Sequence, residues 1–300
     1  MEREIMENTL HKLENEHIKA AITPDDGGRL VELTDKSNNR NFIWTNKRTK
    51  IFKRYYGANY DNLSAGGVEE AFPSVFPEQI DDNDFPFFGE IWSAPWKADN
   101  ANRESVTLSC YSSIYPVAVQ KTWSIEGQKC ICRYKLINEG YLPILSLFGV
   151  HPSFAVMPED KLIMPDGRYI LGVVKPEQCG LNVNDAFDWP AVSGRDLSNF
   201  RPNIETMECI QFHTANMVDG SIRLIGKDEH SLHLTFDHKF FTSTCVWQIF
   251  GGWRGHYTVM LEFFTGWPLK LSEAISASNC LTIAPMQSVE TQVTYKIYNK

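Results

Sequence analysis

Apolar and polar residues alternate with a period of two along much of the chain, and this pattern predicts β-strands. The alternation is regular in three neighbouring segments, 106–110, 117–123 and 130–136. Turn-forming residues separate them from one another or end them, as at Glu126-Gly127 and Asn138-Glu139-Gly140. The chain is therefore expected to form mostly antiparallel sheet with hairpin connections.

Other patterns are rare. A helical period is visible only over residues 269–275, and no internal repeat stands out. Residues 175–203 contain three prolines and many Asn and Asp residues, which predicts a long irregular excursion. Long loops in compact domains are often functional, but this one could equally be decoration.

Length and charge limit the classes of protein and partner. All-β domains of 300 residues do occur, so we expect one domain over 1–300. A net charge of -8 without a basic run argues against a nucleic-acid partner. No apolar stretch approaches the roughly 20 residues of a membrane span, so no membrane partner is expected. The charged start Met1-Glu2-Arg3-Glu4 is unlike a secretory signal, and we expect a cytoplasmic protein. The sequence carries no signal of oligomeric state.

Metal and disulfide chemistry is not expected. The seven cysteines are scattered, and Cys130 and Cys132 would share one face of a strand as buried free thiols. His230 and His233 are three positions apart, so in a strand they would point to opposite faces. We predict neither a metal site nor a cofactor.

Two ionisable residues lie in strongly apolar segments. Glu262 is within Val-Met-Leu-Glu-Phe-Phe at 259–264, and His151 follows Gly-Val at 149–150. An ionised carboxylate in such surroundings costs several kcal/mol unless it is paired, so its presence needs a reason. Acid-base chemistry is one reason. The structural alternatives are a core histidine bonded to backbone and a carboxylate held by a basic residue, for which Arg254 is nearest in sequence.

Several short motifs, in order along most of the chain, resemble the aldose 1-epimerase (galactose mutarotase-like) superfamily. They are Thr23-Pro24-Asp25-Asp26-Gly27-Gly28-Arg29, Gly66-Gly67 with Phe72-Pro73, Phe88-Gly89-Glu90-Ile91-Trp92, Asn138-Glu139-Gly140, His151-Pro152-Ser153-Phe154, and Leu261-Glu262 with Thr265 and Pro268. Each motif alone is weak, whereas their order and spacing together carry the resemblance.

The resemblance implies an all-β fold, a large antiparallel β supersandwich with a sugar site in a cleft across one sheet. It also implies a cofactor-independent epimerase that interconverts the anomers of an aldose, a small-molecule sugar substrate. By the same resemblance Glu262 is the general base and His151 the general acid. An imidazole titrates near neutral pH and can give a proton, and a carboxylate shielded from water is a better base than one in bulk solvent.

Further sugar-binding candidates follow from the same comparison. Gln248 resembles the glutamine that bonds a sugar hydroxyl, and Phe88 stands where most active relatives carry a second histidine. Of Trp92, Trp96, Trp247 and Trp253, about one is expected to stack on a sugar while the others fill the core. Arg254 is a further substrate-binding candidate, whereas Arg29 is expected to be structural.

Phe88 keeps a second class of function open. Phenylalanine can neither donate nor accept the hydrogen bond of the missing histidine. The alternative to an epimerase is therefore a non-catalytic carbohydrate-binding protein on the same fold. An accessory domain of a larger carbohydrate-active enzyme is a third and weaker alternative.

Overall fold

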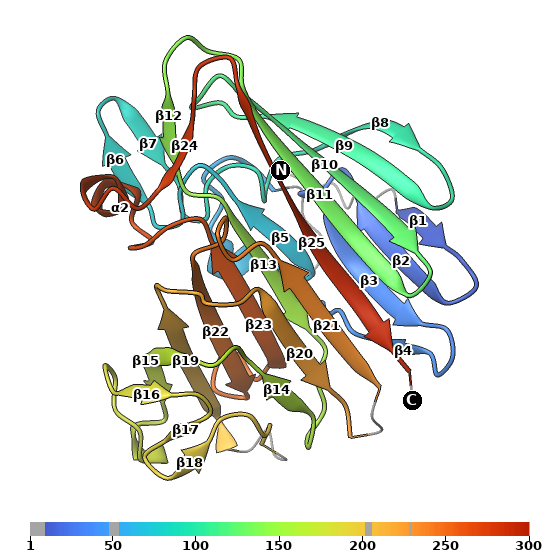
Figure 1. The fold of residues 1–300 in the computed structure, drawn as a ribbon, viewed down its shortest axis with the longest axis vertical. Coiled ribbons are helices and arrows are strands. Elements are labelled where there is room, and N and C mark those ends of the chain that lie inside the picture. Colours follow the sequence, from blue (N-terminus) through green and yellow to red (C-terminus); the bar gives the residue numbers. More distant parts are fainter. Residues whose placement is uncertain (1–9, 48–53, 202–205, 228–229, 300) are drawn as a thin grey trace, which may run out of the picture.

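The computed structural model describes residues 10–47, 54–201, 206–227 and 230–299. Two large antiparallel sheets lie one over the other and form the body of the molecule (Figure 1). The larger sheet runs in the order β1 (His11–Glu14), β2 (Ile18–Thr23), β3 (Arg29–Asp35), β5 (Val68–Ala71), β13 (Gly149–Phe154), β23 (Tyr257–Phe264), β22 (Ser243–Phe250), β19 (Glu208–Thr214), β15 (Arg168–Lys175) and β16 (Ala186–Asp188), with β4 (Arg40–Asn41) beside β3.

The second sheet has eight strands and covers one face of the first. Its order is β14 (Lys161–Ile163), β20 (Ser221–Ile225), β21 (Ser231–Phe236), β25 (Ser288–Tyr298), β11 (Lys129–Asn138), β10 (Val117–Glu126), β9 (Ser105–Tyr111) and β8 (Lys97–Ala101). The alternating segments seen in the sequence are β9, β10 and β11, which pair antiparallel as neighbours. The all-β, sandwich-like fold class is thus confirmed.

The remaining elements are short. They are the two-stranded pairs β6 (Glu78–Ile80) with β7 (Asn83–Phe85), β12 (Ile144–Ser146) with β24 (Leu281–Ile283) and β17 (Ala191–Val192) with β18 (Arg195–Asp196), the helices α1 (Tyr60–Leu63) and α2 (Leu271–Ser276), and the 3-10 turn η1 (Glu177–Cys179). The helix α2 overlaps the segment predicted to be helical, 269–275, and ends one residue beyond it. Among the described residues, no helix is long and apolar enough to cross a membrane.

The predicted excursion at 175–203 is partly ordered. After β15 the chain forms η1, returns as β16 to extend the large sheet, and then makes the β17–β18 hairpin. The carbonyl of Leu197 in this region accepts a hydrogen bond from Gln248 on β22. The excursion therefore packs on the end of the large sheet. The prediction of irregular structure over 175–203 is correct only in part, because β16, β17 and β18 lie within this segment.

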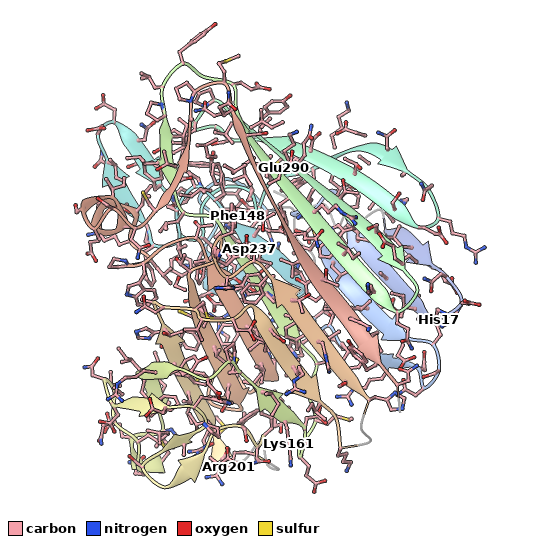
Figure 2. The ribbon with its side chains drawn as sticks, in the orientation of Figure 1. His17, Phe148, Lys161, Arg201, Asp237 and Glu290 are labelled. Carbon is pink, nitrogen blue, oxygen red and sulfur yellow. The ribbon has the colours of Figure 1, made fainter. Side chains whose placement is uncertain are left out.

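The core lies between the two sheets, where alternate side chains from both meet. Phe148 is fully buried in this core, whereas Figure 2 shows His17 and Lys161 at the edges of the molecule. A buried ion pair joins the layers, since Nζ of Lys121 on β10 lies 2.6 Å from Oε2 of Glu70 on β5. The hydroxyl of Tyr134 donates to the other oxygen of Glu70. The seven cysteines are free, and Cys130 and Cys132 are buried as predicted.

Candidate active site

A row of polar side chains crosses the face of the large sheet that points away from the second sheet. In the register of the sheet, Glu69 lies opposite His151, Glu262 lies opposite Cys245, and Cys245 lies opposite His213 on the next strand. Between β13 and β23, the pairs Val150 with Phe263 and Ser153 with Met260 set a register that brings His151 opposite Glu262. Directly opposed residues in a sheet share a face. The row therefore draws on five adjacent strands.

A pocket of about 620 Å³ opens over this row. His151 and Glu262 lie in its wall, and Met260, Gln211 and Trp247 form the next row along the same strands. The volume is within the range of small-molecule sites, which run from about 300 to 1,000 Å³. The lining is largely apolar with a few polar groups, as is usual for a site that orients one ligand.

His151 and Glu262 are in direct contact. Nε2 of the imidazole lies 3.0 Å from Oε1 of the carboxylate, and both side chains are less than one-tenth exposed. Burial alone would lower the pKa of His151, but the charge and hydrogen bond of Glu262 and the charge of Glu69 outweigh it and raise that pKa. The proton shared by the pair is therefore held at the imidazole up to higher pH than in a free histidine.

A second contact of His151 comes from Tyr60, the first residue of α1. Its hydroxyl donates to Oε2 of Glu69 over 2.8 Å and lies 3.4 Å from Nδ1 of His151. Nothing in the sequence pattern singled out Tyr60, because it sits in a one-turn helix in a loop between strands. Its proximity to His151 depends on the tertiary fold alone.

Phe88 lies in the pocket wall, although it is only 3% exposed. Its ring stacks on Tyr60 with 4.6 Å between centroids and meets His151 edge-on at 5.1 Å. The backbone at Phe88 has φ 65°, and Gly89 at φ 69° approaches the backbone of Phe72 so closely that a side chain would not fit. This turn thus presents an apolar ring to the imidazole.

Gln248 is not brought to the pocket, which corrects the expectation of a sugar contact. Adjacent strand residues point to opposite faces, and on β22 it is Trp247, not Gln248, that lines the pocket. The Gln248 amide instead donates to the carbonyl of Leu197 over 2.7 Å. The glutamine in the pocket is Gln211 on β19. Its place could have been found from Cys-Ile-Gln-Phe-His at 209–213, where Gln211 and His213 alternate with apolar residues.

The tryptophans divide between pocket and core. Trp247 and Trp253 both line the pocket, one more than expected, whereas Trp96 packs over Lys121 in the core. Trp92 is also away from the pocket lining. It is 1% exposed and packs edge-on behind Tyr60 at 5.0 Å. Trp92, one of the four candidates for a sugar contact, therefore belongs to the core and not to the pocket lining.

Arg254 lies beside the pocket and not in its lining. Its guanidinium donates to Oδ1 of Asn62 over 3.0 Å and lies over the ring of Trp253. Glu262 pairs with His151 and not with Arg254, which had been the structural alternative for that carboxylate. Arg29, expected to be structural, is buried and contacts Asp26 and the carbonyl of Gly66.

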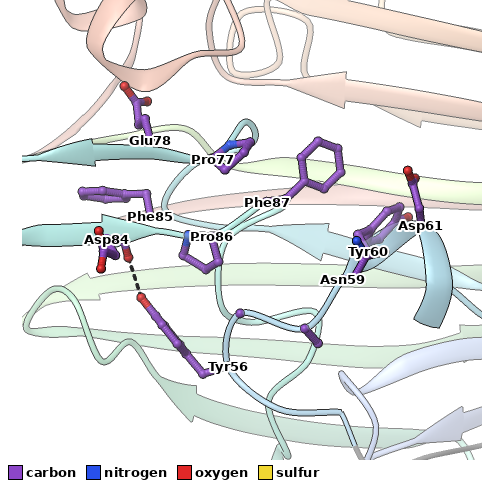
Figure 3. Close-up of a pocket in the computed structure, with 12 residues that line it drawn as sticks. Tyr56, Asn59, Tyr60, Asp61, Pro77, Glu78, Asp84, Phe85, Pro86 and Phe87 are labelled. Carbon is purple, nitrogen blue, oxygen red and sulfur yellow. Dashed lines mark hydrogen bonds between the residues drawn. The ribbon is translucent and has the colours of Figure 1, made fainter.

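A second, more open hollow of about 730 Å³ adjoins the pocket (Figure 3). Tyr60, Asp61 and Phe87 belong to the walls of both. At the other end, the hydroxyl of Tyr56 donates to the backbone carbonyl of Asp84. Within the described part of the chain, no group of three or more His, Cys, Asp and Glu side chains is arranged to hold a metal ion.

Comparison with known proteins gives little at the level of sequence. A family model described as a domain of unknown function (DUF5107) matches residues 3–84. No curated protein sequence matches the chain.

Solved structures give a clear match at the level of fold. The Slr1438 protein from Synechocystis sp. PCC 6803 superposes with a TM-score of 0.74 at 12% identity, over 100% of this chain and 99% of its own. A galactose mutarotase related enzyme from Lactobacillus acidophilus gives 0.70 at 12% identity, over 97% and 98%. A galactose mutarotase-like protein from Lactobacillus casei gives 0.67 at 14%, over 97% and 100%. The chain has the galactose mutarotase-like fold that its sequence motifs indicated.

Proposed function

We propose that this protein is a cofactor-independent sugar epimerase that interconverts the anomers of an aldose in the pocket over His151 and Glu262. The observation that carries the proposal is the contact between Nε2 of His151 and Oε1 of Glu262, 3.0 Å apart and buried in the pocket wall. An acid and a base this close can act on two neighbouring oxygens of one sugar. The mutarotase-like names of two structural relatives add support.

The proposed reaction needs two coupled proton transfers. Glu262 takes the proton of the anomeric hydroxyl while His151 gives its Nε2 proton to the ring oxygen. The bond between C1 and the ring oxygen breaks, and C1 becomes a carbonyl carbon. Rotation about the bond between C1 and C2 exposes the other face, and the reverse transfers close the ring. Both groups return to their starting protonation states.

The pocket wall supports a sugar as the ligand. Trp247 and Trp253 offer aromatic faces against which the apolar face of a pyranose can pack. Gln211 offers an amide that can both donate to and accept from sugar hydroxyls. Gly172, on the neighbouring strand β15, leaves the space that the Gln211 side chain occupies.

Phe88 favours a second candidate function, a non-catalytic carbohydrate-binding protein. Its ring faces His151 at the place where the resemblance leads one to expect a second histidine. A site with one hydrogen-bonding group fewer near the ring oxygen could bind a sugar without opening it. The two candidates share the pocket and differ only in turnover.

One pair of measurements separates them. Anomeric exchange is followed by NMR across a panel of aldoses, and sugar binding is measured on the same samples by calorimetry. The epimerase proposal expects exchange to be accelerated for at least one sugar that binds. Binding without any acceleration, for every sugar that binds, would support the binding protein instead.

A further inference from the structure

Tyr60 joins His151 to a buried group of charges that the reaction itself does not use. Its hydroxyl lies between Oε2 of Glu69, at 2.8 Å, and Nδ1 of His151, at 3.4 Å. Glu69 is fully buried, and its other oxygen lies 3.5 Å from Nη1 of Arg29 and 3.3 Å from Nη1 of Arg54. Arg54 also pairs with Asp26 at 3.0 Å. Two buried positive charges thus surround a carboxylate that in turn holds Tyr60.

The number of protons available fixes the direction of each hydrogen bond. A phenol has one proton, and an ionised carboxylate can only accept. The Tyr60 proton therefore points to Glu69, and its oxygen is left to accept from His151. Burial, then the charge of Glu69, raises the pKa of Tyr60 well above its usual value, so the phenol keeps this proton. Nδ1 of His151 is then the donor to Tyr60. By the same count Nε2 is the donor to Glu262, so the ring that satisfies both contacts carries both protons.

We propose that Tyr60 is a positioning residue that, backed by Glu69, holds the protonated His151 ring with its Nδ1–H toward the Tyr60 oxygen and its Nε2–H toward Glu262. Nε2 is then the nitrogen that gains and loses the exchangeable proton, and it is the one that faces Glu262. The catalytic meaning of this arrangement rests on the proposed acid role of His151. The protonation and orientation of the ring are properties of the protein without substrate.

The arrangement has a clear use in acid catalysis. When Nε2 gives its proton to the ring oxygen, His151 becomes neutral with Nδ1–H still bonded to Tyr60, so the ring need not turn or exchange partners. The ionisable groups around the imidazole are Glu262 from β23, Glu69 from β5 and Tyr60 from α1. Phe88 stacks on Tyr60 and meets His151 edge-on, so it packs against both rings without offering a competing polar atom.

The test is ¹⁵N NMR of the His151 imidazole in the full chain, with the signals assigned by their loss in His151→Gln. We expect His151 in the unmodified protein to carry protons on both nitrogens up to a pH above 6.5. Tyr60→Phe keeps the ring that stacks on Phe88 but removes the acceptor of Nδ1–H, so the pKa of His151 should fall, while Nε2 keeps Glu262 as partner. Tyr169→Phe is the matched control, because its buried hydroxyl donates to the carbonyl of Pro165. It should leave the pKa of His151 unchanged.

The kinetic arm measures anomeric exchange in the same variants. We expect Tyr60→Phe to lower kcat by about tenfold or more with little change in sugar affinity, because the neutral ring left after Nε2 gives up its proton then holds an Nδ1–H without an acceptor. A His151 pKa at or below 6.5 in the unmodified protein would overturn the inference, and so would an unchanged His151 pKa in folded Tyr60→Phe. The first of these results does not require the variant to fold. If the pKa of His151 behaves as expected but no sugar is epimerised, only the proposed function fails.

Discussion

His151 and Glu262 face each other across the neighbouring strands β13 and β23, with Nε2 and Oε1 3.0 Å apart. The residues are 111 positions apart in sequence, yet the sheet register alone aligns them. Glu69 continues the same row on the other side of His151, and Cys245 continues it beyond Glu262. Burial raises the pKa of Cys245, so this thiol stays protonated and offers no nucleophile. The row thus has one acid-base pair at its centre.

The pH dependence of exchange follows from the raised pKa of His151. The acid is the protonated imidazole, so activity is retained below this pKa and lost as pH rises through it. We therefore expect the alkaline limb of kcat/KM to lie above 6.5, the ordinary value for histidine. Because the profile of kcat/KM reports the free enzyme, the same value should appear when His151 is titrated by NMR. An alkaline limb below 6.5 would contradict this assignment.

Gln211 and Gln248 should respond differently to the same substitution. Gln211→Ala removes an amide from the pocket. It should weaken sugar binding by roughly 2- to 10-fold, which corresponds to the net free energy of one hydrogen bond. Gln248→Ala leaves the buried carbonyl of Leu197 without its donor. It should lower the free energy of unfolding by about 1 to 3 kcal/mol and leave sugar affinity unchanged. Calorimetric titrations and denaturant melts on both variants check this, and the reverse pattern would show that the two roles are exchanged.

Phe88→His tests what the apolar ring contributes to the pocket. The new imidazole would lie beside His151 in the pocket wall, where it can bond a sugar oxygen. We expect faster anomeric exchange of common hexoses, together with a loss of about 0.5 to 1.5 kcal/mol of stability from the broken stacking on Tyr60. Phe88→Leu is the control, since it loses the stacking without gaining a polar group. Lower stability with no gain in rate would mean that Phe88 serves packing only.

Much of the fold could be predicted from the sequence because it rests on local signals. Period-two alternation and turn residues located β9, β10 and β11, and ordered motifs indicated the galactose mutarotase-like fold. His151 and Glu262 stood out because ionisable residues in apolar strands are costly. Their contact could only be inferred from the resemblance, since no local pattern encodes the register between β13 and β23.

The remaining site residues show where such reasoning stops. Gln248 was chosen by resemblance, although its neighbour Trp247 on the same strand points to the pocket and the two cannot share a face. Tyr60 was missed because the one-turn helix α1 carries no periodic signal and its contacts come from β5 and β13. Trp92 packs behind Tyr60 in the core. The residue type alone could not predict this, because a large aromatic ring can fill a core as readily as it can line a pocket.

The measurement that tests the central claim most directly is anomeric exchange by NMR in Glu262→Gln, with a sugar that the unmodified protein turns over. Loss of a positioned general base should lower kcat by about 100-fold or more, while sugar affinity stays close to that of the unmodified protein. Glu273→Gln, a surface change on α2, should leave both values unchanged. An unchanged kcat in a folded Glu262→Gln protein would contradict the acid-base role of the His151–Glu262 pair.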